Sequence, residues 1–439
     1  METQEIRIEE NGLKVIFEVR ENGIVELKQF TTAGKPDRNR EPRDKQASYS
    51  ITEIQLTGKG SRNMHGYKHN LSSASEEFHY VNHTLEKAEK GQQLIIHTKS
   101  DYGVELRYHM QFFDGISAVQ VWTEVKNNGT EAVGLEYVSS FIYHGLCANG
   151  ELPYYDKTQI YTPYNSWCCE AQWKKDSAKQ LNLNGMMVDG FNTPGFGLNR
   201  YCYGGRGSWS SCEYLPMGIC EDTEAKETYF FQIEHSGQWL VEYGSSSGPT
   251  EMENGWWKNL KPGDTFETVP VGFGVADGSL NEAMAELTKY RRAIRRENDD
   301  DKKLNIVFND YMNCLMGDPI ESTEKEIIDK AAEMGCEYYC MDAGWYDKGY
   351  WWDRVGEWKE SPERFPNGMK SVCDYAKSKG LVMGLWLEIE VMGVECELAK
   401  KLPDNWFICR HGKRHIDNKR YLLDFRNPEV RAYCREVVD

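Results

Sequence analysis

Acidic and amide side chains follow three consecutive apolar segments in the last third of this 439-residue chain. Asn309 and Asp310 follow the first segment, Asp342 the second, and Glu388 and Glu390 the third. The strand ends of a parallel α/β barrel form one active-site face, so these side chains would meet over one mouth. Aromatic residues lie near them in the sequence, at Trp345, Tyr346, Trp351, Trp352, Trp358 and Trp386. Sugar C–H faces pack on aromatic rings and sugar hydroxyls need polar partners, so we predict a sugar pocket rather than a phosphate or metal site.

Some of these residues also have ordinary structural explanations. Glu388 and Glu390 could be loop carboxylates that form salt bridges or cap helices. Trp386 ends an apolar segment and could belong to the core. Asp342 stands between a strand end and Gly344, and for this residue the functional interpretation is favoured.

The elements that must position these residues alternate between strand and helix after residue 303. The pattern predicts strands at 304–308, 338–341 and 381–386, helices at 323–335, 368–380, 394–401 and 428–438, and an extended piece at 421–425. Thr323 is the expected cap of the first helix, with Glu326 as its capping-box partner and Gly335 at its end. A complete eight-fold barrel takes roughly 250 residues, so residues 304–439 are expected to form an incomplete (β/α)8 (TIM) barrel. A doubly wound sheet is the alternative, but residues 309–313 are not the Gly-rich phosphate turn that such a sheet usually carries.

The first two thirds of the chain are predicted to be β structure. Asn-Gly pairs favour tight hairpins, and they begin at Asn11, Asn22, Asn128, Asn149, Asn184 and Asn254. Residues 15–19 and 24–27 are the expected arms of one hairpin, and many strands with short turns imply a sandwich. The apolar spacing of 280–291 predicts a helix, and a charged segment follows it. The predicted domains are therefore 1–285 (β domain), 286–303 (linking helix and charged linker) and 304–439 (incomplete barrel).

The composition of the chain limits the classes of binding partner that we expect. The net charge of −17 argues against nucleic acid and anionic membranes, because phosphate binding needs a cationic surface. No apolar run approaches the roughly 18 residues of a membrane span, and the first five residues do not resemble a secretory signal. The 13 cysteines follow no framework, so we expect reduced thiols in a cytoplasmic protein and no structural zinc site.

Several ordered motifs in the last third resemble one family. They are Asp342-Ala343-Gly344-Trp345, Gly356-Glu357-Trp358, Arg364-Phe365-Pro366-Asn367-Gly368-Met369, Gly384-Leu385-Trp386-Leu387-Glu388-Ile389-Glu390 and Leu423-Asp424-Phe425-Arg426-Asn427-Pro428-Glu429-Val430. In type, order and spacing they resemble the α-galactosidases of glycoside hydrolase family 36. The β domain is similar to the β-supersandwich of that family, including Leu260-Lys261-Pro262-Gly263-Asp264 before the linking helix. The resemblance implies a multidomain β plus α/β protein.

The same resemblance implies an activity and its catalytic groups. Family 36 enzymes are retaining hydrolases of terminal α-galactosyl groups and need no cofactor; such enzymes use two carboxylates about 5–5.5 Å apart. In the family the nucleophile is an Asp on the fourth strand and the acid/base an Asp on the sixth. Residues 428–438 correspond to the helix before that fourth strand, so we expect both catalytic groups beyond Asp439 and none within this chain.

The substrate-binding residues that the resemblance implies do fall within the chain. Asp342 would accept hydrogen bonds from the galactose C4 and C6 hydroxyls. Tyr311 stands where the family commonly has a Trp that packs on the sugar, and Trp386 matches another pocket aromatic. The predicted set is completed by Trp345, Trp352, Trp358 and Glu388, with one arginine from the 410–420 loop as a further candidate.

An oligomer is also expected. Trp167 resembles a Trp that covers the site of a neighbouring subunit in the family, although an ordinary surface-loop Trp fits its sequence equally well. We therefore expect a homo-oligomer of the full-length protein.

Two departures from the family pattern leave the substrate open. Ala343 replaces the second Asp of Asp-Asp-Gly-Trp, and Ile389 replaces a usual Pro. Losing a charge-assisted contact costs about 1.5–3 kcal/mol, enough to change sugar preference. An α-N-acetylgalactosaminidase, an α-galactosyl transferase and a non-catalytic carbohydrate-binding protein therefore remain alternatives.

Overall fold

The computed structural model describes residues 3–38, 49–60, 72–183, 200–206, 209–244 and 256–439. It divides into two compact units, unit 1 (Met1–Arg295) and unit 2 (Arg296–Asp439). The expected Asn-Gly turns at Asn184 and Asn254 lie outside the described residues.

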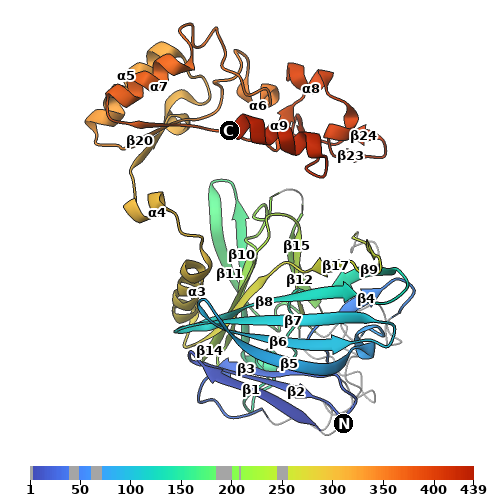
Figure 1. The fold of residues 1–439 in the computed structure, drawn as a ribbon. Coiled ribbons are helices and arrows are strands. Elements are labelled where there is room, and N and C mark those ends of the chain that lie inside the picture. Colours follow the sequence, from blue (N-terminus) through green and yellow to red (C-terminus); the bar gives the residue numbers. More distant parts are fainter. Residues whose placement is uncertain (1–2, 39–48, 61–71, 184–199, 207–208, 245–255) are drawn as a thin grey trace. The chain divides into compact units, whose positions relative to one another are not determined.

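A ten-stranded antiparallel sheet dominates unit 1, in the order β11-β10-β13-β14-β18-β8-β7-β6-β5 with β17 paired to β8 (Figure 1). Its strands are β5 (His79–Ala88), β6 (Gly91–Lys99), β7 (Val104–Phe113), β8 (Ile116–Asn127), β10 (Thr158–Ser166), β11 (Cys169–Ser177), β13 (Met217–Asp222), β14 (Glu227–Ile233), β17 (Thr265–Glu267) and β18 (Val271–Asp277). Every pairing in this sheet joins antiparallel neighbours, so short turns suffice to connect most of them.

Three smaller sheets complete unit 1. They contain β1 (Gln4–Glu10), β2 (Leu13–Val19) and β3 (Val25–Thr32); β4 (Ile54–Leu56), β9 (Val133–Val138) and β16 (Lys258–Leu260); and β12 (Arg200–Gly205) with β15 (Trp239–Gly244). Two short helical elements lie between strands, η2 (Ser75–Glu77) and α1 (Tyr154–Lys157). The hairpin predicted around Asn22-Gly23 is confirmed, since β2 pairs with β3 and Gly23 has a φ of +83°. All of β2 is buried, because its apolar side chains share one core with β6, β7 and β8.

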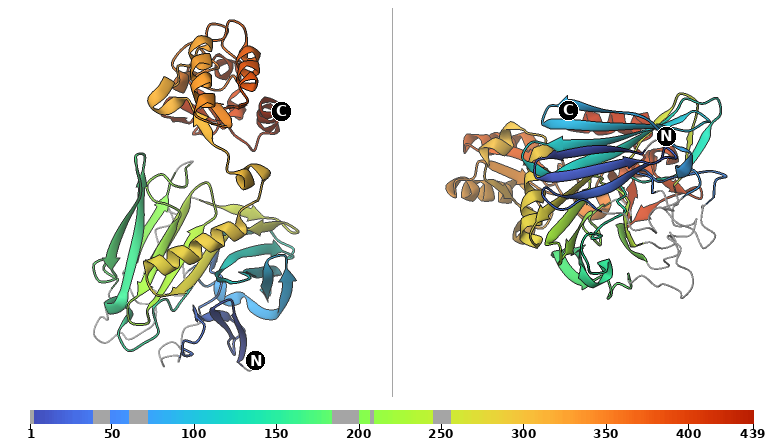
Figure 2. Two further views of the ribbon diagram at one scale, coloured as in Figure 1. Left: turned by 90° about the vertical axis from the view of Figure 1, so that its left-hand side faces the viewer. Right: turned by 90° about the horizontal axis from the view of Figure 1, so that it is seen from below.

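Helix α3 (Leu280–Ile294) lies across the large sheet of unit 1 (Figure 2, left). It begins with a capping box between Ser279 and Glu282. Its buried residues are Ala283, Leu287 and Tyr290, and Leu280 and Met284 are partly buried against the same core.

Unit 2 is built on three parallel strands, in the order β19 (Val307–Asn309), β20 (Tyr338–Met341) and β21 (Val382–Leu385). Helices α5 (Glu321–Glu333) and α7 (Met369–Ser378) connect them and pack against each other. Ile328 and Ala331 of α5 share a core with Val372 and Ala376 of α7 and with Tyr339 of β20. The predicted alternation of strand and helix is therefore confirmed, with β19 and β21 shorter than expected.

The predicted start of the first helix is wrong. Helix α5 begins at Glu321, and its N-cap is Ile320, which makes no side-chain capping bond. The Glu321 carboxylate instead accepts from the Asn367 backbone N–H at 3.1 Å and pairs with Lys325 at 2.6 Å. These contacts hold the first turn without Thr323.

The other elements of unit 2 are α4 (Asp299–Lys303), η3 (Tyr311–Leu315), α6 (Trp351–Arg354), β22 (Val391–Gly393), α8 (Glu397–Lys401), η4 (Asp404–Trp406), β23 (Cys409–Arg410), β24 (Lys413–Arg414), β25 (Ile416–Asp417), β26 (Arg420–Leu422) and α9 (Pro428–Val438). Helix α9 has the predicted bounds, and α8 is shorter than predicted. The sheet β22-β26-β25 was not predicted; it pairs the segment after Glu390 with the segment before Leu423. Within the described residues, no helix has the length and apolar character needed to cross a membrane.

Candidate functional site

The carboxyl ends of β19 and β20 bring three predicted polar residues together. Asn309 Nδ2 donates to Asp342 Oδ2 at 2.8 Å, and the Asp342 backbone N–H donates to Asp310 Oδ1 at 2.7 Å. The Ala343 N–H donates to Asp342 Oδ1, also at 2.7 Å. The two strands are adjacent and parallel, so their ends must meet in this way. Asp342 is half-buried, and each of its carboxylate oxygens has a second lone pair for a further donor.

Rings from the loops after β20 and β21 form one aromatic cluster. Trp386 follows β21 and packs edge-to-face with Trp351 at 5.6 Å and with Trp358 at 5.9 Å between ring centroids. The Trp345 indole N–H donates to the Trp386 carbonyl oxygen at 3.1 Å, and Tyr311 packs edge-to-face on Trp351 at 5.6 Å. Trp352 packs edge-to-face on Trp351 at 5.2 Å, and Tyr311 is contributed by η3 after β19. The cluster therefore contains all five aromatic residues of the predicted substrate-binding set.

Burial separates two roles within that cluster. Trp345 is 5% exposed and Trp351 is 9% exposed, so both rings support their neighbours from the core. Tyr311, Trp358 and Trp386 are half-buried, so part of each ring remains accessible.

Glu388 and Arg420 form a buried ion pair beside these rings. The Arg420 Nη1 to Glu388 Oε2 distance is 2.5 Å. The Arg420 guanidinium lies 3.6 Å from the ring centroid of Trp352, and its Nε donates to the Trp352 carbonyl oxygen at 3.0 Å. Burial raises the pKa of Glu388, and the Arg420 charge opposes that rise. The structural alternative considered for Glu388, a salt bridge, is the arrangement observed.

The structure distinguishes among the arginines of the 410–420 loop. Arg410 is exposed and Arg414 pairs with Asp404 at 2.6 Å. Arg420 is 4% exposed, and its Nη2 has no hydrogen-bond partner in the described part of the chain. Arg420 is therefore the loop arginine best placed for a hydroxyl ligand.

One carboxyl group near the site was missed by sequence reasoning. Glu324 of α5 is fully buried, and Tyr339 of β20 donates its hydroxyl to Glu324 Oε2 at 2.7 Å. Its burial could have been predicted from its spacing along the helix. Glu324 stands four residues before Ile328 and seven before Ala331, which places all three on the buried face of α5.

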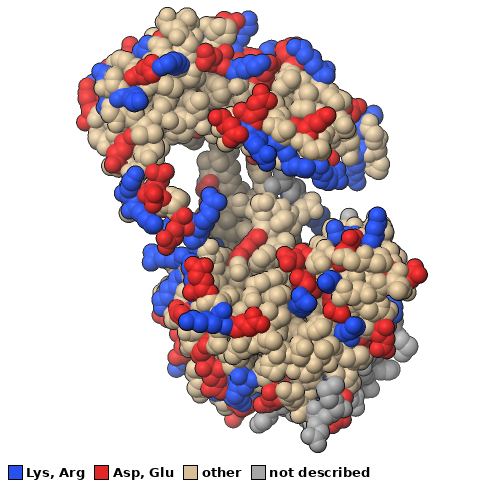
Figure 3. Space-filling view, viewed as in Figure 1, with Lys and Arg blue, Asp and Glu red and all other residues tan. Residues whose placement is uncertain are grey.

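No metal site emerges from the described ranges, which contain no cluster of three or more His, Cys, Asp or Glu side chains able to hold an ion. Acidic and basic side chains are interspersed over the face that Figure 3 shows.

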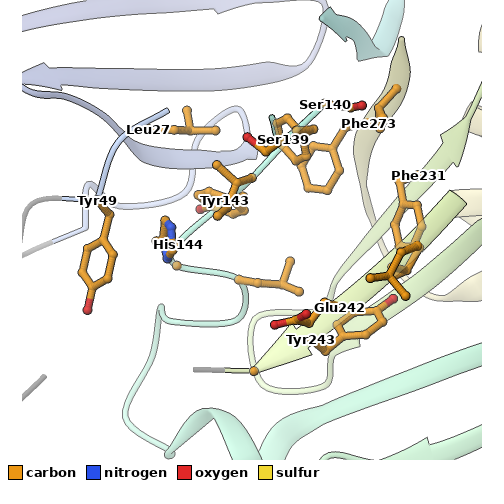
Figure 4. Close-up of a pocket in the computed structure, with 18 of the residues that line it drawn as sticks. Leu27, Tyr49, Ser139, Ser140, Tyr143, His144, Phe231, Glu242, Tyr243 and Phe273 are labelled. Carbon is orange, nitrogen blue, oxygen red and sulfur yellow. The ribbon is translucent and has the colours of Figure 1, made fainter. Parts of the chain in front are cut away.

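Unit 1 contains a cavity of about 690 Å³ that sequence reasoning did not find. Tyr143, His144, Phe231, Tyr243 and Phe273 line it (Figure 4). Burial lowers the pKa of His144 to about 4, so that imidazole is neutral near pH 7.

Comparison with known proteins shows which sequences this chain resembles. Residues 265–439 match the family model described as Melibiase. Alpha-galactosidase Mel36A of Lactobacillus acidophilus is 27% identical over 365 residues, which cover 80% of this chain and 46% of that protein. Alpha-galactosidase AgaA of Geobacillus stearothermophilus is 28% identical over 229 residues, covering 49% of this chain and 31% of that protein. The chain thus spans at most about half the length of these relatives.

Solved structures share the fold. The crystal structure of AgaA aligns with a TM-score of 0.78 at 19% identity and covers 99% of this chain and 63% of that chain. An α-galactosidase from Lactobacillus brevis aligns with a TM-score of 0.75 at 15% identity, covering 99% of this chain and 61% of that chain. In sequence and in fold, the chain is therefore similar to glycoside hydrolases. More particularly, the resemblance to the family 36 α-galactosidases is confirmed.

Proposed function

We propose that this chain carries the galactose-binding part of a retaining α-galactosidase that removes terminal α-galactosyl residues from oligosaccharides. The observation that carries the proposal is the Asp342 carboxylate, which Asn309 and the Ala343 N–H hold at the end of β20. The neighbouring strand end carries the half-buried Trp386, whose backbone N–H donates to the Met341 carbonyl oxygen at 2.9 Å. Two of the roughly four acceptor positions of this carboxylate are in use, which leaves two for neighbouring sugar hydroxyls. Relatives named as α-galactosidases support the same reaction class.

Raffinose and stachyose are the proposed type of substrate. Variants of AgaA are described in complex with raffinose and with stachyose. Both are oligosaccharides with a terminal α-galactosyl group, which the proposed Asp342 contacts would recognise. We propose Tyr311, Trp345, Trp352, Trp358, Trp386 and Glu388 as the remaining substrate-binding set, in which Trp345 and Glu388 act through the neighbours that they hold.

The finer architecture belongs to the same proposal. Unit 1 would be the β-supersandwich, and β19, β20 and β21 with α5 and α7 would be the first part of a (β/α)8 barrel. We propose substrate binding as the role of residues 304–439. We also propose a cytoplasmic homo-oligomer; Trp167, 84% exposed at the turn between β10 and β11, is available to reach a second subunit.

Galactose titration of the 439-residue chain tests binding. Tryptophan fluorescence should report saturable binding of galactose and none of glucose, and Asp342→Asn should weaken binding at least tenfold. Asp329→Asn is the matched control: Asp329 lies on α5 and pairs with Lys379 at 2.6 Å. Equal response to both sugars, or unchanged binding in Asp342→Asn, would reject this site.

Product analysis tests the reaction. The gene product, expressed with any coding sequence that follows codon 439, should release galactose from raffinose with retention at the anomeric carbon. No release would reject the hydrolase. Tighter binding of N-acetylgalactosamine than of galactose would favour the alternative that Ala343 raises, since this buried methyl group stands where the family has a carboxylate. Galactosylated products formed with excess acceptor sugar would favour a transferase.

A further inference from the structure

Two buried carboxyl groups lie behind Asp342. Asp310 follows β19 and is 2% exposed; Glu324 lies on α5 and is fully buried. Asp310 Oδ1 accepts the Asp342 backbone N–H at 2.7 Å, and Glu324 Oε2 accepts the Tyr339 hydroxyl at 2.7 Å. Each carboxyl group therefore has one oxygen with a donor.

The second oxygen of each carboxyl group lacks such a donor in the described part of the chain. Asp310 Oδ2 and Glu324 Oε1 are both buried, and neither has a donor among the described residues. The two carboxyl groups are within side-chain hydrogen-bonding reach of each other. Two carboxylates in contact repel, and an unsatisfied buried acceptor costs about 1–3 kcal/mol. A single proton shared by the two carboxyl groups removes the charge repulsion and supplies the missing hydrogen-bond donor.

Among the described residues, the groups that act electrostatically on the pair include no cation in place of that proton. The titratable groups that face the pair are Tyr339 of β20, Cys314 of η3 and Asp342, and none of them carries positive charge. Lys325 is the neighbour of Glu324 on α5, but its ammonium group pairs with Glu321 at 2.6 Å. Burial, reinforced by the Asp310 charge, raises the pKa of Glu324 to about 9, and burial also raises the pKa of Asp310.

We infer that Asp310 and Glu324 share one buried proton, and that this proton positions the Asp342 carboxylate for sugar binding. With the proton on Glu324 Oε1, Glu324 donates to Asp310 Oδ2 and still accepts from Tyr339. Asp310 remains an anion and makes a charge-assisted hydrogen bond to the Asp342 N–H. Glu324 is thus a positioning residue that acts through Asp310. The sugar-binding consequence rests on the proposed function; the shared proton does not.

Infrared spectroscopy of the full chain tests the proton directly. A Glu324→Gln substitution keeps the geometry, since its amide nitrogen can donate to Asp310 and its oxygen can accept from Tyr339. The control is Glu321→Gln on the same helix: Lys325 lowers the pKa of Glu321 to about 2, so Glu321 is a carboxylate at pH 7. The wild-type minus Glu324→Gln difference spectrum at pH 7 should contain the carbonyl stretch of one protonated carboxyl group. The corresponding Glu321→Gln difference should contain carboxylate bands only. Absence of the protonated band from the Glu324→Gln difference would overturn the inference.

The pH dependence of stability gives a second, independent readout. The folded-state pKa of Glu324, about 9, exceeds its unfolded value near 4.5, so the folded state holds the extra proton between these limits. The associated stability is full below about pH 4.5 and is lost as pH rises towards 9. Across this window, the unfolding constant of the wild type relative to Glu324→Gln should rise by up to about tenfold per pH unit. Parallel pH curves for the two proteins would overturn the inference.

Galactose binding separates this inference from the proposed function. Glu324→Gln should bind like the wild type, whereas Glu324→Ala, which removes the donor to Asp310, should bind at least tenfold more weakly. If Glu324→Ala folds and binds galactose normally, the positioning role is wrong. If neither the wild type nor any variant binds galactose while the infrared band and the pH slope are present, the proposed function is wrong and the shared proton is still supported.

Discussion

Replacing Arg420 by alanine tests whether the ion pair beside the aromatic cluster organises this part of unit 2. Arg420 is 4% exposed, pairs with Glu388 at 2.5 Å and lies 3.6 Å from the Trp352 ring centroid. Removing one partner of a buried ion pair costs about 3–5 kcal/mol, and the cation–π contact adds about 0.5–2 kcal/mol. The two contributions overlap, so they do not simply add.

The pKa of Glu388 limits that cost. Burial already raises it, and loss of Arg420 removes the charge that opposes the rise. Glu388 can then take up a proton instead of remaining an unpaired anion. We therefore expect Arg420→Ala to destabilise unit 2 by about 3 kcal/mol at pH 8 and by less at pH 5. A group with a raised folded-state pKa loses its stabilising contribution as pH rises, which gives this sign.

Urea denaturation followed by tryptophan fluorescence measures the effect. Arg420→Lys keeps the charge but loses the planar stack on Trp352, so its destabilisation should fall between those of the wild type and Arg420→Ala. Arg426→Ala is the surface control: Arg426 pairs with Asp424 at 2.6 Å, but its side chain is 85% exposed, so little change is expected. A loss below about 1 kcal/mol for Arg420→Ala, or a larger loss at pH 5 than at pH 8, would refute the reasoning.

Three further predictions concern single positions. Asp342→Asn should weaken galactose binding but leave the melting temperature of the chain within a few degrees of the wild type, because Asn309 retains a hydrogen-bond partner. A large fall in the melting temperature, measured by calorimetry, would show that Asp342 has a structural role instead. Lys157→Met should destabilise unit 1 by about 3–5 kcal/mol in urea titration, because the fully buried ammonium group pairs with Asp222 at 3.1 Å and its loss leaves that carboxylate buried; an unchanged midpoint would contradict this. Gly272→Ala should cost about 1–3 kcal/mol by the same assay, since a Cβ there would lie 2.3 Å from Tyr290 Cε1 and would push α3 off the sheet; wild-type stability would show that α3 adjusts freely.

Local sequence signals predicted the framework of unit 2. The apolar run before Asp342 matches β20, and Gly335 and Gly380, both at positive φ, follow the ends of α5 and α7 as expected. These features depend on residues close in sequence. The same argument predicted that Asn309 and Asp342 would meet, because neighbouring parallel strands end at one edge.

Side-chain contacts between residues distant in sequence could not be predicted from such local signals. Arg420 and Glu388 are 32 positions apart and meet only because β26 pairs with β22. The Asp310–Glu324 contact likewise depends on how α5 packs on the strands, although an acidic residue on an apolar helical stripe is a visible sign of it. Thr323 was the expected cap because Glu326, three residues on, would complete a capping box, but the contact of Glu321 with Asn367 holds an earlier start of the helix.

The strands of the parallel sheet are paired in the order of their synthesis. β20 adds to β19 and β21 adds to β20, so each strand can dock as it leaves the ribosome on one already made. Each closure spans one short helical turn and one longer helix, η3 with α5 and then α6 with α7, so the loop entropy of each step stays modest. The last strand of this sheet to be synthesised is β21, on which Val382 is 52% exposed and Leu385 is 38% exposed. During translation this apolar edge is the surface that a chaperone would recognise until another strand or chain covers it.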